Sequence, residues 1–535
     1  MDTHRPEAHR GPRLTWRATV AAACCVAALT ARADEPPAWP ALAGPLGTFA
    51  TAHDDTRLVD DLGRAVKAWD SECGDLGRAK GGSQAFRTVE QFTAAGIAKH
   101  GAHPGSWSGP IVGGGCVFVA SWRPVGPWFA VEGHEVRLDA EDIVVAIDPE
   151  TGRTKWLAAE PGGMLRGGGK REGLHAGPVF HEGTVYSLGS TGRLFAHDAA
   201  TGAKRWESDA HPQRAACRKA RDEALAGLAA GRFKYDLTPD WCASLAVVGG
   251  MLVVPDMKDG LVGIDLRDGS RRWAATGVTT RWATPACWRH DGREYLLVAN
   301  EKGELRLLDP TDGRELWKLA GLGPSWPTLT PGRTHVLVNG VPDSGKRKDQ
   351  PRLGGRYVAV RLGLDKGERD WSAPQDHVIP VWMDSGARQR VVYRNGAFLL
   401  TQCQLAAREA GRPEAPSEEQ HISPAYVLDE ATGRVIARLP STDTDDDLRL
   451  DGLVYWHGDR LISRGDSYHG PSHGGRHPWS HWRVAGGEIR KLPGTMDLSD
   501  FMTAYEVPAE VPLVAGRMFE RTQAGGVVCY DLRAH

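Results

Sequence analysis

The sequence predicts an all-β fold, an eight-bladed β-propeller whose blades are four-stranded antiparallel sheets. Three observations carry this prediction: a hairpin motif recurs along the chain, a second strand pair precedes each copy, and a tryptophan ends most copies. The 65 glycines and 34 prolines are typical of a chain with many turns. Four strands per repeat favour propeller blades over a solenoid coil.

The hairpin motif is clearest in VVAIDPETGRTKW (144–156) and LFAHDAATGAKRW (194–206), which share the pattern A-x-D-x-x-T-G-x-x-x-W. An apolar strand enters a turn in which Asp or Thr can bond local amides, and glycine supplies a positive φ. Further copies are LVGIDLRDGSRRW, LRLLDPTDGRELW, the stretched YVAVRLGLDKGERDW, AYVLDEATGRVIARL without the tryptophan, and the worn HWRVAGGEIRKL and VVCYDL. The glycines expected at the turns are Gly152, Gly202, Gly269, Gly313 and Gly433.

A second strand pair with its own turn lies ahead of each hairpin, as in GPIVGGGCVFVAS (109–121) and GPVFHEGTVYSLGS (177–190). Each unit therefore contains four strands. The units open near Gly109, Gly177, Ser244, Pro285, Pro327, Gln389, Leu453 and Pro512. These openings indicate eight blades, and seven is the alternative because the last copies are faint.

The last unit ends at Arg533 without an outer strand. The segment LGRAVKAWDSE (62–72) is its expected donor, because Trp69 resembles the end of a motif that lacks its beginning. We therefore expect N-terminal and C-terminal strands to share one blade, which removes two free sheet edges.

The repeat resembles that of the pyrroloquinoline quinone (PQQ) family of β-propellers, which includes quinoprotein alcohol dehydrogenases and the assembly lipoprotein BamB. The resemblance runs from about Trp69 to Asp531. It implies that the repeat tryptophans wedge between adjacent blades and have a structural role, since indoles contribute large buried surfaces. These tryptophans are Trp69, Trp156, Trp206, Trp273, Trp317 and Trp371.

The two ends and the insertions complete the domain plan. Residues 1–33 read as an export signal, with three arginines before an apolar run and Ala31-Arg32-Ala33 as the cleavage pattern; a retained signal anchor is the alternative. Residues 34–61 read as an extended arm, and 62–535 as the propeller. The insertions are 122–142, 210–233 (an Ala-rich helix), 341–355 (a basic loop) and 404–420 (a short helix with a tail). We expect an exported protein, periplasmic or extracellular, without a later transmembrane segment.

Charge and cysteine content exclude some classes of protein. With 65 basic and 67 acidic side chains, the net charge of −2 offers nothing to hold a phosphate backbone, so nucleic acid is not an expected partner. Seven scattered cysteines follow the leader, without a C-x-x-C pair. This pattern fits neither a disulfide scaffold nor a zinc module, and Cys217 with Cys242 is the first guess for a pair.

The densest cluster of candidate ligands is YHGPSHGGRHPWSHW, with His469, His473, His477 and His481. Glycines and prolines between them exclude a helix, so the four-residue interval has no helical meaning. A loop can still gather two or three imidazoles around zinc or copper, and a polar aromatic-lined loop is the alternative. The acidic stretch 443–454 lacks the glycine and glutamate of an EF-hand loop and is interpreted as a solvated loop.

The resemblance raises the question of whether PQQ is bound. It implies, for methanol-oxidising relatives, a cofactor between a tryptophan and a disulfide of adjacent cysteines, beside calcium and a catalytic aspartate. The one adjacent pair here, Cys24 and Cys25, leaves with the leader, and no motif marks the other residues. We therefore expect a non-catalytic binding or scaffold module without a cofactor, which holds another protein or a small molecule at one propeller face. The alternative is a PQQ- and calcium-dependent dehydrogenase of small alcohols or sugars.

Overall fold

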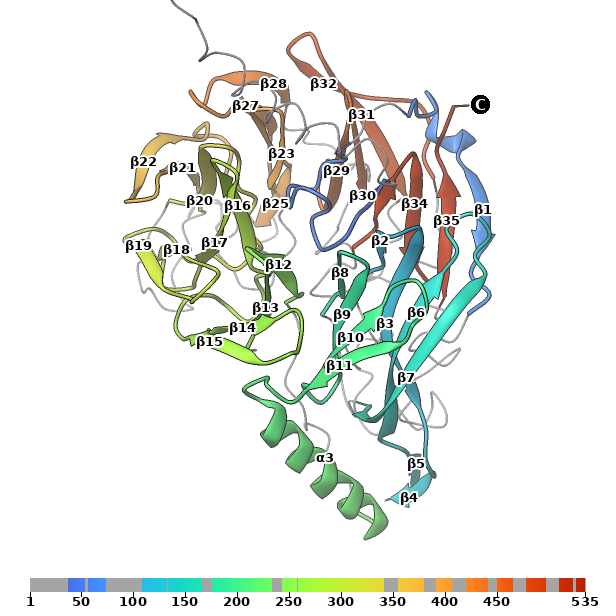
Figure 1. Cartoon of the computed structure of the whole chain (residues 1–535). Helices are drawn as coiled ribbons and strands as arrows, with labels where there is room; N and C mark the ends of the chain where they lie inside the picture. Colours follow the sequence, from blue (N-terminus) through green and yellow to red (C-terminus); the bar gives the residue numbers. More distant parts are fainter. Residues whose placement is uncertain are drawn as a thin grey trace, which may run out of the picture. The chain divides into compact units, whose positions relative to one another are not determined.

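The structure of the chain is a computed structural model (Figure 1). It describes residues 37–52, 56–73, 108–131, 133–165, 176–232, 243–256, 258–340, 355–379, 391–406, 420–440, 450–464, 478–496, 510–522 and 526–534. Residues 1–37 separate from residues 38–535 as a distinct unit, and all that follows concerns the second unit.

The described residues form a series of antiparallel meanders, numbered here in chain order. The first has strands β2 (Ile111–Gly113), β3 (Cys116–Pro124), β6 (Asp139–Ile147) and β7 (Thr154–Met164). The second has β8 (Val179–His181), β9 (Thr184–Leu188), β10 (Leu194–Asp198) and β11 (Lys204–Ser208). The third has β12 (Ala246–Val248), β13 (Met251–Pro255), β14 (Leu261–Asp265) and β15 (Arg271–Ala275). The fourth has β16 (Ala286–His290), β17 (Arg293–Ala299), β18 (Leu305–Leu308) and β19 (Glu315–Leu319).

The fifth meander has three strands, β20 (His335–Asn339), β21 (Tyr357–Leu362) and β22 (Gly367–Ser372), and a single bridge from Pro331 to Val336 stands where its first strand is expected. The sixth has β23 (Val391–Arg394), β24 (Ala397–Leu400), β27 (Ala425–Asp429) and β28 (Val435–Leu439). The seventh has β29 (Leu453–His457), β30 (Arg460–Arg464), β31 (Trp479–Ala485) and β32 (Glu488–Lys491). The eighth has β33 (Leu513–Val514), β34 (Arg517–Arg521), β35 (Val527–Asp531) and β1 (Val66–Asp70).

The order of strands within the meanders confirms the predicted fold class and its closure. The eighth meander has the order β1-β35-β34-β33, with Trp69 opposite Cys529. The N-terminal strand is therefore the outer strand of the sheet that the C-terminus builds. The sixth and seventh meanders join into one eight-stranded sheet through a parallel bridge between Arg438 and Glu488. The number of blades stays a prediction.

Burial explains why the inner strands read as continuous apolar runs. In the third meander every residue of β13 and β14 is buried, whereas the fourth strand, β15, is mostly exposed. A strand whose two faces are both covered shows no polar alternation. Each meander thus packs both faces against its neighbours and leaves its last strand at the rim.

The repeat tryptophans contact the following meander, and each of the six makes the same contact. Each indole N–H donates to a backbone carbonyl in the next motif turn, at 2.8–3.0 Å, as Trp273 does to Pro310. The indole also packs directly against a glycine of the next turn and occupies the space that a Cβ on that glycine would need. A Cβ on Gly313, for example, would lie 2.6 Å from Trp273. Gly313 has a φ of +72°, so the turn and the indole both require glycine there. The acceptors of the six bonds are Pro149, Ala199, Leu266, Pro310, Gly363 and Glu430.

Four further elements are described outside the meanders. They are the 3₁₀ helix Leu62–Arg64, the helix α3 (Arg214–Ala229) and the hairpins β4 (Phe129–Val131) with β5 (His134–Val136) and β25 (Cys403–Ala406) with β26 (Gln420–Ser423). The helix predicted in 210–233 is confirmed. The helix predicted at the start of 404–420 is wrong for residues 404–406, because these residues belong to β25, which pairs with β26. Residues 407–419 and nearly all of 341–355 lie outside the described residues.

Candidate functional site

The long connections all leave the meanders on the same side. Short turns join the first strand of a meander to the second and the third to the fourth, as at Gly249–Gly250 and Asp265–Gly269. The insertions instead join second to third strands or one meander to the next, which places them at the opposite strand ends. We call these two sides the turn face and the insertion face. Loops of this kind are where propellers carry their function.

The insertion face bears a projection formed by helix α3 and the hairpin β4–β5 (Figure 1). Cys217 and Leu228 of the helix are buried in one cluster with Val131 and Leu138. Arg221 fixes the helix by donating from Nε to the Gly163 carbonyl at 2.9 Å, and its guanidinium also pairs with a carboxylate of the first meander. The other side of the helix is exposed and has both charges, with Arg218, Lys219, Asp222 and Glu223.

Residues 38–52, which we call the plug, lie along the first strands of several meanders. The plug bonds to the first strands of four meanders: Trp39 pairs with Val112 of β2, the Pro40 carbonyl accepts from Phe180 of β8, the Thr48 carbonyl accepts from Tyr393 of β23, and Ala50 pairs with Trp456 of β29. First strands line the central axis of a propeller. The predicted extended arm, 34–61, is thus in its described part built into the ring.

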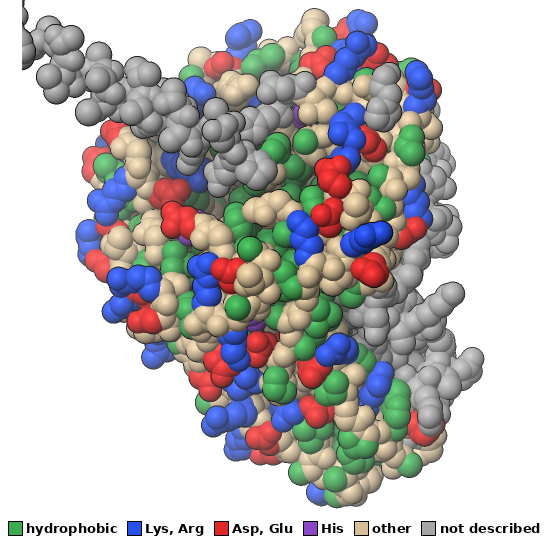
Figure 2. Space-filling view, turned by 45° about the vertical axis from the view of Figure 1, so that its right-hand side comes forward, with side chains coloured by type: hydrophobic (Ala, Val, Ile, Leu, Met, Phe, Trp, Pro, Cys, Tyr) green, Lys and Arg blue, Asp and Glu red, His purple; other side chains and the backbone are tan. Residues whose placement is uncertain are grey.

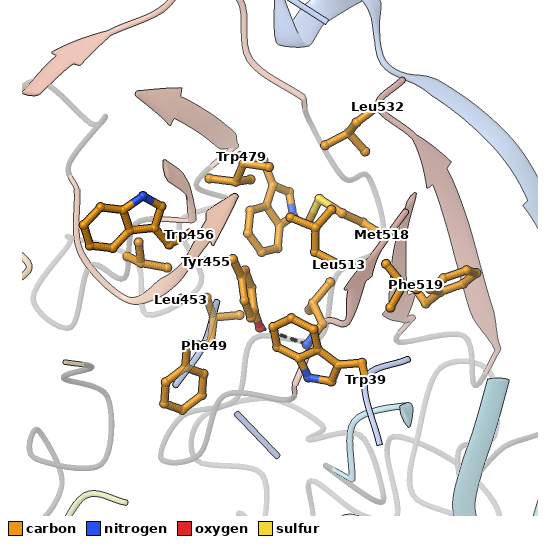
Figure 3. Packing of buried hydrophobic residues seen from close by; sticks show 14 of the residues in the cluster. Trp39, Phe49, Leu453, Tyr455, Trp456, Trp479, Leu513, Met518, Phe519 and Leu532 are labelled. Atoms are coloured by element: carbon orange, nitrogen blue, oxygen red, sulfur yellow. Dashed lines mark hydrogen bonds between the residues drawn. The ribbon is translucent and has the colours of Figure 1, made fainter. Parts of the chain in front are cut away.

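Trp39 and Phe49 of the plug pack among buried side chains of the seventh and eighth meanders (Figure 3). Trp39 is fully buried, and its indole lies edge-on to the Tyr455 ring with centroids 5.5 Å apart. Its N–H donates to Glu510 Oε1 at 3.1 Å. Phe49 is also buried in the cluster that contains Trp456. An indole held by packing and by a charged acceptor is a rigid filler of the axis.

Buried ions gather where the strands of the seventh and eighth meanders reach the insertion face. We call Arg464, Glu510, Glu520 and Arg521 the buried ion cluster; each is less than 8% exposed. Arg521 donates to the Ser108 carbonyl at 3.0 Å and to Ser121 Oγ at 3.1 Å, which ties the eighth meander to the first.

Within this cluster, the carboxyl group of Glu520 has a raised pKa, whereas the pKa of several surface carboxylates in this protein is lowered. Burial raises its pKa to about 8, and the charge of Arg464 offsets this only in part. Arg464 Nη1 lies 3.9 Å from Glu520 Oε1, which is too far for a hydrogen bond. A buried acid with a raised pKa is a candidate for function as well as for structure.

The predicted histidine site is described only at His481. That side chain is buried, and its Nε2 bonds to the Pro493 carbonyl at 2.8 Å. Burial lowers the pKa of His481, so this nitrogen carries the proton of a neutral ring and is not open to a metal. The other three, His469, His473 and His477, lie outside the described residues. Within the described ranges, no group of three His, Cys, Asp or Glu side chains is placed to hold a metal ion.

The remaining predictions on cysteines and spans have partial answers. Cys217 is buried and unpaired, and Cys242 lies outside the described residues. Burial raises the pKa of the Cys217 thiol to about 11, which makes it unreactive.

No helix in the described part of the chain has the length and apolar character needed to cross a membrane. Acidic and basic side chains are interspersed over the face drawn in Figure 2.

Sequence reasoning missed the plug and the buried ion cluster. Residues 38–52 have no strand period, and their proline and glycine content indicates a loop. Glu520 and Arg521 stand at the end of an ordinary strand, and adjacent opposite charges are typical of a solvated strand end. Only the unusual tryptophan at position 39 could have signalled burial.

Comparisons with known proteins agree with this architecture. Residues 140–325 match the family model described as outer membrane protein assembly factor BamB. The quinohemoprotein alcohol dehydrogenase of Comamonas testosteroni aligns over 95% of this chain and 83% of its own, at 14% identity and a TM-score of 0.52. BamB of Moraxella catarrhalis aligns over 78% of this chain and 98% of its own, at 14% identity and a TM-score of 0.42. No curated protein sequence matches the chain. The resemblance predicted from the repeats is confirmed, and the likeness to the dehydrogenase is one of fold alone.

Proposed function

We propose that this PQQ-repeat β-propeller is an exported, non-catalytic binding module that holds a partner protein at its insertion face. The observation that carries the proposal is the asymmetry of the two faces. The projection and the hairpin β25–β26 are both inserted at the insertion face, whereas the described connections at the turn face are short turns. The match of residues 140–325 to a family described as an assembly factor supports a protein as the partner.

The composition of the projection supports a partner with mixed charge. The exposed side of α3 alternates Arg218 and Lys219 with Asp222 and Glu223, one turn apart. Such a surface steers a partner by charge complementarity and contributes more to specificity than to raw affinity. The helix is anchored beneath by Arg221 and by the buried Leu228, so it presents this surface rigidly.

The residues near the axis are poorly suited to PQQ, the cofactor that the fold family implies, and this supports the same proposal. A planar tricarboxylate quinone requires free cations and an open slot at the axis. Here the Trp39 indole occupies axial space, and the Arg521 guanidinium already donates to Ser108 and Ser121. Arg464 faces the carboxylate of Glu520. These residues do not fit the cofactor, and we derive no chemistry through it.

The alternative, a PQQ- and calcium-dependent dehydrogenase, is tested by reconstitution. Purified protein is mixed with PQQ and Ca²⁺, and the quinone absorbance and the reduction of an artificial electron acceptor are followed. We expect no spectral shift and no reduction above a control without protein. A stoichiometric shift with dye reduction would establish the dehydrogenase and overturn the proposal.

Binding at the insertion face is tested by crosslinking from two matched positions. A photoreactive residue is placed at Lys219, exposed on α3, and separately at Arg314, exposed in a turn-face hairpin. In cells that make the protein, we expect a defined crosslinked partner from position 219 and none from position 314. Equal crosslinking from both positions, or from 314 alone, would contradict the proposal.

A further inference from the structure

A small cavity with both polar and apolar lining lies between the first and second meanders. Its polar lining comes from five side chains: Ser121, Asp142, Glu160, Ser187 and His197. The backbone of Gly189 closes it, and a Cβ at that position would lie 2.4 Å from Asp142 Oδ2. Its volume is about 10 Å³, which is near the minimum that one water molecule needs.

Asp142 presents a bare acceptor to this cavity. The residue is 5% exposed, and its Oδ1 accepts from the Ser190 amide at 2.8 Å. Its Oδ2 accepts no hydrogen bond from the described residues. A buried carboxylate oxygen without a donor is costly, which is why burial raises the pKa of Asp142.

His197 presents a second bare acceptor. Its ring is 1% exposed, and Nε2 lies 3.1 Å from Glu160 Oε1. Because a carboxylate can only accept, Nε2 carries the proton and Nδ1 is left as an acceptor. Burial lowers the pKa of His197 and so keeps the ring neutral. No described residue bonds to Nδ1.

We propose that the cavity is a binding site for one water molecule, which donates one hydrogen bond to Asp142 Oδ2 and the other to His197 Nδ1. Asp142 and His197 both line the cavity and each has a buried acceptor without a described donor, so an occupant with two protons to donate would satisfy both, and water has the size and the donors. A sodium ion would satisfy the carboxylate, but a neutral imidazole is a poor ligand for it.

Two residues that line the cavity are bonded to charged side chains outside it. On one side Ser121, which lines the cavity, accepts from Arg521 of the buried ion cluster. On the other side Glu160 bonds to Lys204 Nζ at 2.9 Å, and Lys204 is 39% exposed. The occupant therefore joins Asp142 of the first meander to His197 of the second.

A crystal structure at high resolution tests the site directly. We expect one fully occupied peak within about 2.7–3.1 Å of both Asp142 Oδ2 and His197 Nδ1. An empty cavity would overturn the proposal, and so would a peak at the shorter distances typical of a metal ion. Melting temperatures in equal concentrations of sodium, potassium and choline chloride distinguish the two occupants. Water predicts the same value in all three, and a specific rise with sodium or potassium would identify a cation instead.

The variant Asp142→Val adds a second readout. It removes the acceptor, so we expect the peak to be lost and the melting temperature to fall by about 2 °C or more. A variant that keeps the peak at the same place would contradict the assignment. If the variant does not fold, the density in the unaltered protein decides the question alone.

Discussion

The seams between the early meanders and those between the late meanders are held in different ways. From the closing seam at Trp69 through the fifth meander, each seam has an indole that donates into the next turn, as Trp273 does. In the sixth meander Ala437 stands at the position of the tryptophan, opposite Val427, and β32 of the seventh meander contains no tryptophan. There the outer strands β28 and β32 pair directly, and the plug packs on β29 from within. The repeat motif therefore lacks its tryptophan in the part of the ring where strand pairing and the plug supply other contacts.

The largest expected effect comes from the plug. Trp39→Ala removes a fully buried indole and the hydrogen bond that it donates to Glu510 Oε1. We expect the free energy of unfolding to fall by about 3–5 kcal/mol, measured by urea denaturation with tryptophan fluorescence and circular dichroism. A loss below about 1 kcal/mol would show that the plug is a peripheral strap.

A turn glycine gives the next largest effect, because it breaks one indole seam at a defined point. Gly313→Ala places a Cβ 2.6 Å from Trp273 at a φ of +72°. We expect a loss of about 1–3 kcal/mol from strain and overpacking. Gly292→Ala is the matched control, since its φ is +77° and nothing lies within 4 Å of the added Cβ. Equal losses in the two variants would remove the indole from the explanation.

The hydrogen bond of a seam can be separated from its packing. Trp317→Phe keeps an aromatic ring but removes the N–H that donates to Gly363 at 2.8 Å. Because the Gly363 carbonyl is then left short of a donor, we expect a loss of about 1–3 kcal/mol that includes the smaller ring. Trp317→Ala should cost clearly more in the same denaturation assay, and equal costs would mean that packing contributes nothing.

The pH dependence of stability sharpens the account of the late seams. The folded-state pKa of Glu520, about 8, lies above its ordinary value of 4.5, so the folded protein holds a proton that the unfolded chain releases in this range. Its contribution to stability is complete below pH 4.5 and declines as the pH rises toward 8. His211 and His377, with pKa values lowered to about 4, act in the opposite direction but only up to about pH 6.5.

The comparison of the protein with Glu520→Gln between pH 6.5 and 8 isolates this group. We expect the stability of the unaltered protein to fall over this interval and that of the variant to fall less, as followed by thermal melting. Parallel curves would contradict a protonated Glu520 in the folded protein.

The difference between the seams also explains what could be predicted from the sequence. Tryptophans and turn glycines are local and repeat, so Trp69 could be assigned to the closing sheet from its pattern alone. The plug has no period, and its burial depends on first strands more than 60 residues away in sequence, such as β2 and β29. Residues 404–406 were expected in a helix because of the Ala-rich, charged composition that follows, yet pairing with β26 overrides that preference.

The candidate site divides in the same way. The insertions were visible as breaks in the repeat, which is enough to locate the face but not the projection. Asp142 and His197 are ordinary strand residues in sequence, and only the packing of two meanders brings them to one cavity. The pKa of Glu520 is raised by burial, and the residues around Glu520 in the sequence do not indicate that burial.

The central claim, that the plug is an integral part of the ring, is tested most directly by hydrogen–deuterium exchange. The Trp39 amide donates to Val112, and the Thr51 amide donates to Trp456. We expect peptides that cover residues 38–52 to exchange as slowly as those that cover β2 and β29. Full exchange of the plug within seconds, while those strands stay protected, would contradict the account.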